Sequence, residues 1–117
     1  MPLIQVFTSA TSPAPPAEEA LHEDLSRVLT EYLRKPKQWI MTSVLPGLSM
    51  TFGGSRAPAC IASLKNVGSM SPEVTSGLSR ELCAILSKAL GVPTERIYID
   101  FQDAAPSMWG WNGDTFG

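Results

Sequence analysis

The chain of 117 residues has a formal net charge of −2 and a pI of about 5.3, and its length suits a single domain over residues 1–117. The acidic balance disfavours nucleic acid and anionic membrane surfaces as partners. Because no stretch has the length of a membrane span or the pattern of a secretory signal, we expect a cytoplasmic protein.

The first half of the chain is predicted to form a strand, a helix and a second strand. The first strand covers the apolar run Leu3–Phe7. Apolar residues then recur at the spacing of one helical face. They are Leu21, Leu25, Val28, Leu29 and Leu33. Pro15 and Pro16 precede this helix, and Pro36 follows its end, where proline cannot continue a helix. Because few residues separate the helix from the next strand, the two strands should be parallel with a right-handed crossover.

The second half of the chain repeats the first at an offset of 57 residues. The segment LRKPKQWI begins at Leu33 and LGVPTERI begins at Leu90, and both fit the frame L-x-x-P-x-x-x-I. The same offset carries the strand Leu3–Phe7 onto Cys60–Leu64. It also carries the apolar helical stripe onto a second one, which follows Pro72 in a Ser-Pro-Glu helix start. The second half should therefore also fold as strand, helix and strand.

Two such β-α-β repeats predict an α+β (α/β) fold, with a four-stranded mixed sheet and both helices on one of its faces. Apolar residues on both sides of the strands, such as Leu3 and Ile4, argue against a second face left in water. We expect copies of the chain to cover that face in a closed homo-oligomer.

Two segments lie outside the repeat. Val44–Pro58 contains Pro-Gly and Gly-Gly turn signals around a short apolar patch, which predicts an extra edge strand and a loop. Gln102–Gly117 is rich in aromatic residues. We expect this tail to dock on its own sheet edge or on a neighbouring subunit.

Few residues offer catalytic or metal-binding chemistry. The cysteines, Cys60 and Cys83, lie too far apart for a zinc or redox spacing and are expected to be buried. The single histidine, His22, is expected on the surface of a helix without a nucleophile partner, and Asp100 is expected to face outward from its strand. The FGGS stretch reads as a turn, because it lacks a phosphate-loop pattern. We therefore expect no metal and no cofactor.

The start of the chain, MPLIQVF, offers a less common group. If Met1 is removed, Pro2 supplies a secondary amine with an ordinary pKa of roughly 7.7–8. Burial or a nearby cation lowers this pKa, so such an amine can act as a general base. The alternative is that Pro2 only begins the strand.

Six stretches of the sequence resemble the macrophage migration inhibitory factor (MIF) family of the tautomerase superfamily. They are MPLIQV, KPKQWIMTSV, MTFGGS, ASLKNVG, RIYIDF and WGWNGDTFG, in this order along the chain. The resemblance implies a homotrimer of β-α-β-β-α-β subunits with an active site at each subunit interface. It also implies that Pro2 shuttles a proton between carbon and oxygen of an aromatic α-keto acid, such as phenylpyruvate or hydroxyphenylpyruvate. D-dopachrome analogues are a second substrate type.

The resemblance also assigns roles to residues around Pro2. Lys35 matches the lysine that binds the substrate carboxylate and lowers the pKa of the amine, and Val67 supplies a backbone N–H and an apolar wall. Tyr98 matches the tyrosine that a neighbouring subunit contributes. Trp111 and Phe116 match aromatic residues near the mouth of the pocket.

Three positions depart from the family pattern. Asp100 stands where animal members commonly have asparagine, and Trp109 replaces a smaller residue at the rim and narrows the pocket. The Cys-x-x-Cys motif is absent, so thiol–disulfide exchange is not expected. One rival function is a cytokine-like ligand of a receptor, exported without a signal peptide, in which the pocket is vestigial. Another is hydration or dehalogenation, which would need arginines paired with the amine.

Overall fold

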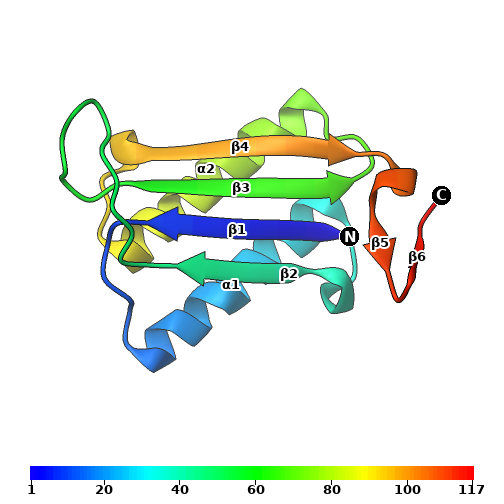
Figure 1. Ribbon diagram of the computed structural model, residues 1–117, viewed down its shortest axis with the longest axis horizontal. Coiled ribbons are helices and arrows are strands. Elements are labelled where there is room, and N and C mark those ends of the chain that lie inside the picture. The colour runs from blue at the N-terminus through cyan, green and yellow to red at the C-terminus, as the bar shows by residue number, and fades with distance from the viewer.

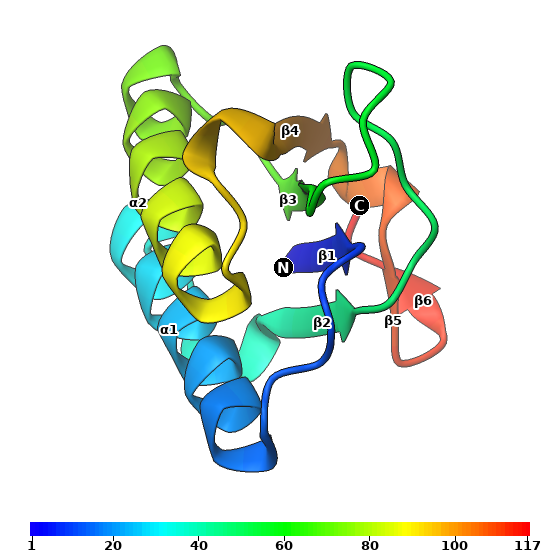
Figure 2. The ribbon, with the colours of Figure 1, turned by 90° about the vertical axis from the view of Figure 1, so that its left-hand side faces the viewer.

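The computed structural model describes residues Met1–Gly117 as a four-stranded sheet with two long helices on one face (Figure 1, Figure 2). The main elements are β1 (Pro2–Thr8), α1 (Pro15–Leu33), β2 (Met41–Leu45), β3 (Cys60–Val67), α2 (Pro72–Leu90) and β4 (Ile97–Ala104). The shorter ones are the 3-10 helices η1 (Lys37–Trp39), η2 (Thr94–Arg96) and η3 (Pro106–Met108), and the strands β5 (Gly110–Trp111) and β6 (Asp114–Thr115).

The sheet has the order β2-β1-β3-β4. β1 is parallel to β2 and β3 is parallel to β4, whereas β1 and β3 are antiparallel at the centre. Each parallel pair is thus one β-α-β repeat, and the two repeats join through their first strands. The predicted mixed sheet with both helices on one face is confirmed.

The offset of 57 residues seen in the sequence also holds for the boundaries of the helices. α1 and α2 begin and end at equivalent positions, and so do η1 and η2. Both long helices end in a left-handed residue, Arg34 with φ 55° and Gly91 with φ 68°. Each of these residues donates its backbone N–H to the carbonyl four residues earlier, at Thr30 and Ser87. The two halves therefore stop their helices by the same device.

The helices begin differently. In α2 the hydroxyl of Ser71 accepts a hydrogen bond from the Val74 N–H at 3.2 Å, and Pro72 is the first helical residue. α1 has no side-chain cap, and it begins at Pro15 itself. The prediction that Pro15 and Pro16 precede this helix is therefore wrong, because they are its first two residues. Proline fits there because the first turn of a helix needs no backbone donor.

The core lies between the helices and one face of the sheet. Alternate residues of β1 and β3, among them Ile4 and Leu64, are fully buried and pack on the apolar stripes of the two helices. The leucines at equivalent positions of the repeats, such as Leu25 and Leu82, are fully buried as well. The 3.6-residue and 2-residue periodicities in the sequence thus meet in one apolar layer.

The opposite face of the sheet carries no helix (Figure 2). By strand register, its rows differ in polarity. One row is apolar and consists of Leu45, Phe7, Ile61 and Tyr98. The next is polar and consists of Ser43, Gln5, Ser63 and Asp100. The expectation of an apolar second face therefore holds for part of it only.

The segment Val44–Pro58 does not form an extra edge strand. β2 ends at Leu45, and the rest is a loop closed by a single bridge between Phe52 and Ser55. The guanidinium of Arg96 donates hydrogen bonds to four carbonyls of this loop at 2.9–3.2 Å. These carbonyls belong to Phe52, Ser55, Ala57 and Pro58. Because a side chain satisfies the loop's acceptors, no partner strand is needed.

The C-terminal tail folds back as a hairpin at the end of the sheet where β1 begins (Figure 1). β5 and β6 are joined through Asn112 (φ 52°) and Gly113 (φ 86°), the Asn-Gly pair that two-residue hairpin turns favour. The tail folds on its own chain, but it does not pair with an edge of the main sheet as predicted, because β5 and β6 form a separate sheet and Trp111 packs on Trp39 of η1. No helix of the chain is both long and apolar enough to cross a membrane.

Candidate functional site

Pro2 is the first residue of β1, which is one of the two central strands of the sheet, and its side chain is buried. In the structure the terminal amine belongs to Met1, and the pKa of that amine is lowered from 8.0 to about 6. Burial is the largest cause, followed by the positive charge of Lys35 and a hydrogen bond from its side chain. At neutral pH this end of β1 therefore carries an amine largely in its uncharged form.

Lys35 reaches this amine from the end of α1. It follows Arg34, whose left-handed backbone ends the helix, and it is half-buried. Its Nζ donates a hydrogen bond to the carbonyl of Val67 at 3.0 Å. Val67 is the last residue of β3. The structure thus brings together Pro2, Lys35 and Val67, three of the predicted site residues.

Aromatic side chains lie beside this cluster. Trp111 of β5 packs edge-to-face on Trp39 of η1, with ring centroids 4.8 Å apart, and Phe116 lies parallel to Trp111 at 6.3 Å. Trp109 is half-buried, and its carbonyl accepts a hydrogen bond from the Phe116 N–H. Three predicted aromatic residues therefore share one hairpin at the Pro2 end of the sheet.

Trp39 was not among the residues predicted for the site. It stands in the KPKQWI segment, four residues after Lys35, in the part that the repeat places between helix and strand. A sequence signal was thus present. What the sequence could not supply was the contact with Trp111, 72 positions further along.

Tyr98 and Asp100 lie away from Pro2 within the chain. Tyr98 is in register with Ile61, which faces Phe7 near the end of β1. Phe7 is five positions along β1 from Pro2, a span of roughly 17 Å along a strand. Asp100 is exposed on the uncovered face, as its alternation predicted. One chain therefore does not bring all the predicted site residues together.

Tyr98 has its own surroundings at the far end of the sheet. Its ring is 4.7 Å from that of Phe52, and the guanidinium carbon of Arg96 lies 5.2 Å from the Phe52 ring centroid. A mainly apolar hollow of about 370 Å³ lies beside this pair. It is lined in part by Met50, Phe52, Ile61 and Tyr98. Arg96 thus fixes both the loop and the aromatic pair that forms this end.

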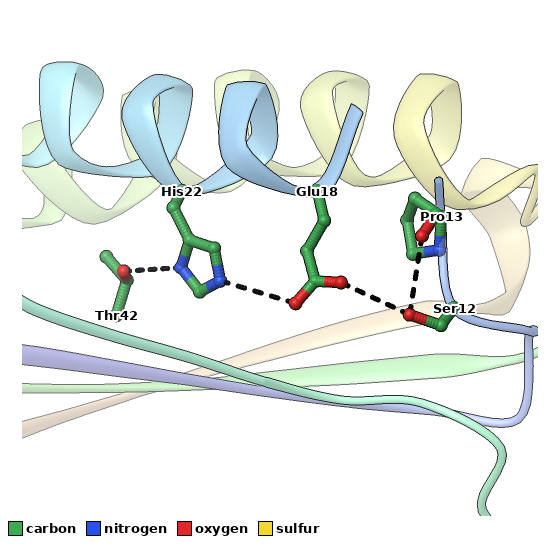
Figure 3. A network of polar contacts seen from close by, with 5 residues as sticks. All are labelled: Ser12, Pro13, Glu18, His22 and Thr42. Atoms are coloured by element: carbon green, nitrogen blue, oxygen red, sulfur yellow. Dashed lines mark hydrogen bonds and ion pairs between the residues drawn. The ribbon is translucent and has the colours of Figure 1, made fainter. Parts of the chain in front are cut away.

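His22 is not an isolated surface residue (Figure 3). Its Nδ1 lies 2.7 Å from the hydroxyl of Thr42, and its Nε2 lies 4.0 Å from a carboxylate oxygen of Glu18. Glu18 in turn accepts a hydrogen bond from Ser12 at 3.2 Å. His22 was expected on the surface without a nucleophile partner; it is half-buried, and its partner is the hydroxyl of a threonine on the edge strand. The contact fastens α1 to the edge strand β2, where Thr42 pairs with Ile4, two positions along β1 from Pro2.

The cysteines are both free thiols. Cys60 is buried, and burial raises its pKa to about 12. Cys83 is only half-buried, contrary to the prediction, with its sulfur 3.7 Å from the Thr94 carbonyl. No group of three or more His, Cys, Asp or Glu side chains is arranged to hold a metal ion.

The whole chain, residues 1–117, matches the family model described as macrophage migration inhibitory factor (MIF). The macrophage migration inhibitory factor of Xenopus tropicalis is 34% identical over 116 residues, which cover 99% of each protein. The crystal structure of the homologue from Prochlorococcus marinus has a TM-score of 0.92 and 38% identity, covering 98% of this chain and 99% of the other. The factor from Toxoplasma gondii has a TM-score of 0.91 and 27% identity, covering 97% and 99%. These similarities extend over nearly the full length of both partners.

Proposed function

Because the chain belongs to the macrophage migration inhibitory factor family, we propose that it is a cofactor-free keto–enol tautomerase of aromatic α-keto acids, with phenylpyruvate and hydroxyphenylpyruvate as substrate types. Dopachrome-like compounds are a second type. The observation that carries the proposal is the place of Pro2 at the buried start of β1 beside Lys35, where burial and the lysine charge lower the pKa of the Met1 amine to about 6. A Pro2 amine would meet the same two effects. A base with a pKa near the working pH is suited to removing and returning a proton.

The proposed reaction needs the chain to begin at Pro2. The uncharged ring amine takes the proton from the enol oxygen and then returns it to the neighbouring carbon as the keto form arises. In the reverse direction the proton moves from carbon to oxygen. No electron pair leaves the substrate, so no redox cofactor is required. Lys35 binds the carboxylate and stabilises the negative charge that develops on the enolate.

The surroundings of the amine support an aromatic substrate. The ammonium of Lys35 offers one positive charge for a carboxylate, while Trp39, Trp111 and Phe116 offer apolar surface for a ring. Val67, at the end of β3, supplies an apolar wall and its main chain next to Lys35. Trp109 limits the width of the pocket in this proposal.

We further propose that the protein acts as a cytoplasmic homotrimer. Tyr98 and Asp100 lie far from Pro2 in their own chain, so they can serve a site only if a neighbour supplies them. The apolar row of the uncovered face, which contains Tyr98, gives a neighbouring subunit a surface to pack on.

The test follows the loss of the phenylpyruvate enol by ultraviolet absorbance in three forms of the protein. These are the form beginning at Pro2, Pro2→Gly, and a form that retains Met1. Blocking or replacing the ring amine should lower the rate by about 10²–10⁴-fold, the usual contribution of a positioned base. Equal rates in all three folded forms would contradict the enzymatic proposal and favour a cytokine-like ligand of a receptor.

A further inference from the structure

We propose that Asn66 is a positioning residue for the terminal amine, whose side-chain oxygen accepts a hydrogen bond from Pro2 once the chain begins there. This inference deepens the proposed function and depends on it for its catalytic meaning. The contact itself can be tested without any enzyme assay.

Strand register sets Asn66 beside Pro2. Pro2 of β1 lies directly opposite Asn66 of β3, and both residues are buried. Ile4 and Leu64, the next inward pair of the same two strands, are buried as well, so all four face the helices. Directly opposed residues in an antiparallel pair have their Cβ atoms about 4.5–5.5 Å apart. The side-chain oxygen of asparagine and the ring nitrogen of proline each lie two bonds from Cβ, which puts a hydrogen bond within reach.

The side-chain oxygen of Asn66 has no partner. Asn66 is 3% exposed, and its Oδ1 is the one buried side-chain nitrogen or oxygen of the chain without a hydrogen bond. At the other end of the same strand pair, the hydroxyl of Thr8 donates to the Ala59 carbonyl at 2.8 Å. An unpaired buried acceptor is costly, so such a group calls for a donor that the chain itself does not supply.

Neither charged neighbour uses this oxygen. The Nζ of Lys35 donates to the carbonyl of Val67, the residue after Asn66. Asp103 lies opposite Asn66 on β4, and its Oδ1 accepts from the Met70 N–H at 3.0 Å. Lys65, the preceding residue of β3, points to the uncovered face by strand alternation. The Asn66 oxygen is therefore a neutral acceptor left over between an ammonium and a carboxylate.

The amine is the donor that fits. An N-terminal proline carries one N–H when neutral and two when protonated. If the protonated amine donates one N–H to Asn66, its second N–H has one fixed direction. That second proton is the one exchanged with the substrate. An acceptor also favours the protonated amine, so Asn66 raises its pKa while burial and Lys35 lower it. The opposing effects keep the amine able both to take a proton and to return it.

The experiment titrates the terminal amine directly. Protein beginning at Pro2 is labelled with ¹⁵N-proline, and the pH dependence of the amine nitrogen shift is followed by NMR in wild type, Asn66→Leu and Asn66→Asp. Asn66→Leu should lower the amine pKa by about one unit because the acceptor is lost. Asn66→Asp should raise it by about one unit or more because a carboxylate replaces the amide. The rising limb of kcat/KM against pH should move in the same directions.

Thr8→Val is the matched control, because it removes a buried polar group at the end of β1 opposite to the amine. It should leave the amine pKa unchanged. An unchanged pKa in folded Asn66→Leu would overturn the inference, since a structural role alone would alter only stability or the plateau rate. If Asn66→Leu does not fold, Asn66→Asp decides, and an amine pKa equal to that of wild type overturns the inference. Failure of the tautomerase assay with these shifts present would refute the proposed function and leave the contact standing.

Discussion

Lys35 combines two effects on the proposed site, one on the base and one on the substrate. Its positive charge lowers the pKa of the terminal amine, second to burial among the causes. Its ammonium is also the cation that would bind a carboxylate. The two effects can be separated because only the first one changes the pH at which activity appears.

We predict that kcat/KM of the wild type rises as the pH passes the lowered pKa of the terminal amine and is flat above, because the uncharged amine is the active form. The Met1 amine, which meets the same burial and the same lysine, has a pKa of about 6. In Lys35→Ala the amine pKa should move back towards its ordinary value of 8.0. Because burial, the larger cause, stays in place, the rising limb shifts to higher pH by only part of this interval, and the rate at pH 7 falls by about twofold from this cause alone. Steady-state kinetics from about pH 5 to about pH 9 measures the rising limb of kcat/KM in both proteins.

Lys37→Ala serves as the control for this experiment. Lys37 lies two residues further on and is exposed, so it should leave the limb in place. If Lys35→Ala changed KM without moving the limb, Lys35 would bind substrate but would not tune the base.

Among single residues, the sequence predicted the cluster of Pro2, Lys35 and Val67. It did not predict Trp39 or Asn66, because their importance arises from contacts across strands and hairpin.

At the level of the elements, the two helix ends differ in chemistry although they share a geometry. Both are left-handed, but the first half has Arg34 where the second has Gly91. A residue with a Cβ is strained in this conformation, whereas glycine is not. In the first half, the strained residue Arg34 directly precedes Lys35.

We predict that Arg34→Gly stabilises the protein by about 0.5–1 kcal/mol, as relief of the left-handed strain exceeds the added freedom of the unfolded chain. Gly91→Ala should destabilise it by about 1 kcal/mol. A Cβ at Gly91 would meet no atom within 4 Å, so only the backbone conformation is altered. Urea unfolding at one fixed protein concentration measures both changes. Equal stability of all three proteins would show that the helix ends carry no strain.

The elements themselves were largely predictable, because periodicity and the repeat at 57 residues act through local sequence. The helix ends at Leu33 and Leu90 follow from the same frame in both halves. The segment Val44–Pro58 was not predictable in this way. Its conformation depends on Arg96, which lies 38–44 positions from the carbonyls that it binds. A long-range side-chain contact of this kind leaves no local pattern.

At the level of the whole molecule, the predicted site is split between the two ends of the sheet. The amine end holds Pro2, Lys35 and the aromatic hairpin, and the other end holds Tyr98 with Phe52 on the loop fixed by Arg96. The exposed fraction of Tyr98 is 62%, which is a large apolar ring for a monomer to leave in water. In the proposed trimer, the amine end of a neighbouring subunit would cover the ring of Tyr98.

Subunit mixing tests this division, because two variants damaged at opposite ends can complement each other only across an interface. We predict that Pro2→Gly and Tyr98→Ala are each strongly impaired at low phenylpyruvate concentration. Co-assembly of equal amounts from denaturant should restore about a quarter of the wild-type rate, since each intact site needs one chain of each kind in a fixed order.

The control mixes the same two variants after each has assembled separately, and it should show no gain beyond the sum of the two. Recovery without co-assembly, or none with it in particles that light scattering shows to be trimers, would contradict a site shared between subunits. A monomer of full activity would contradict it more directly, because Tyr98 lies roughly 17 Å along the sheet from the amine of its own chain and has no site there to complete.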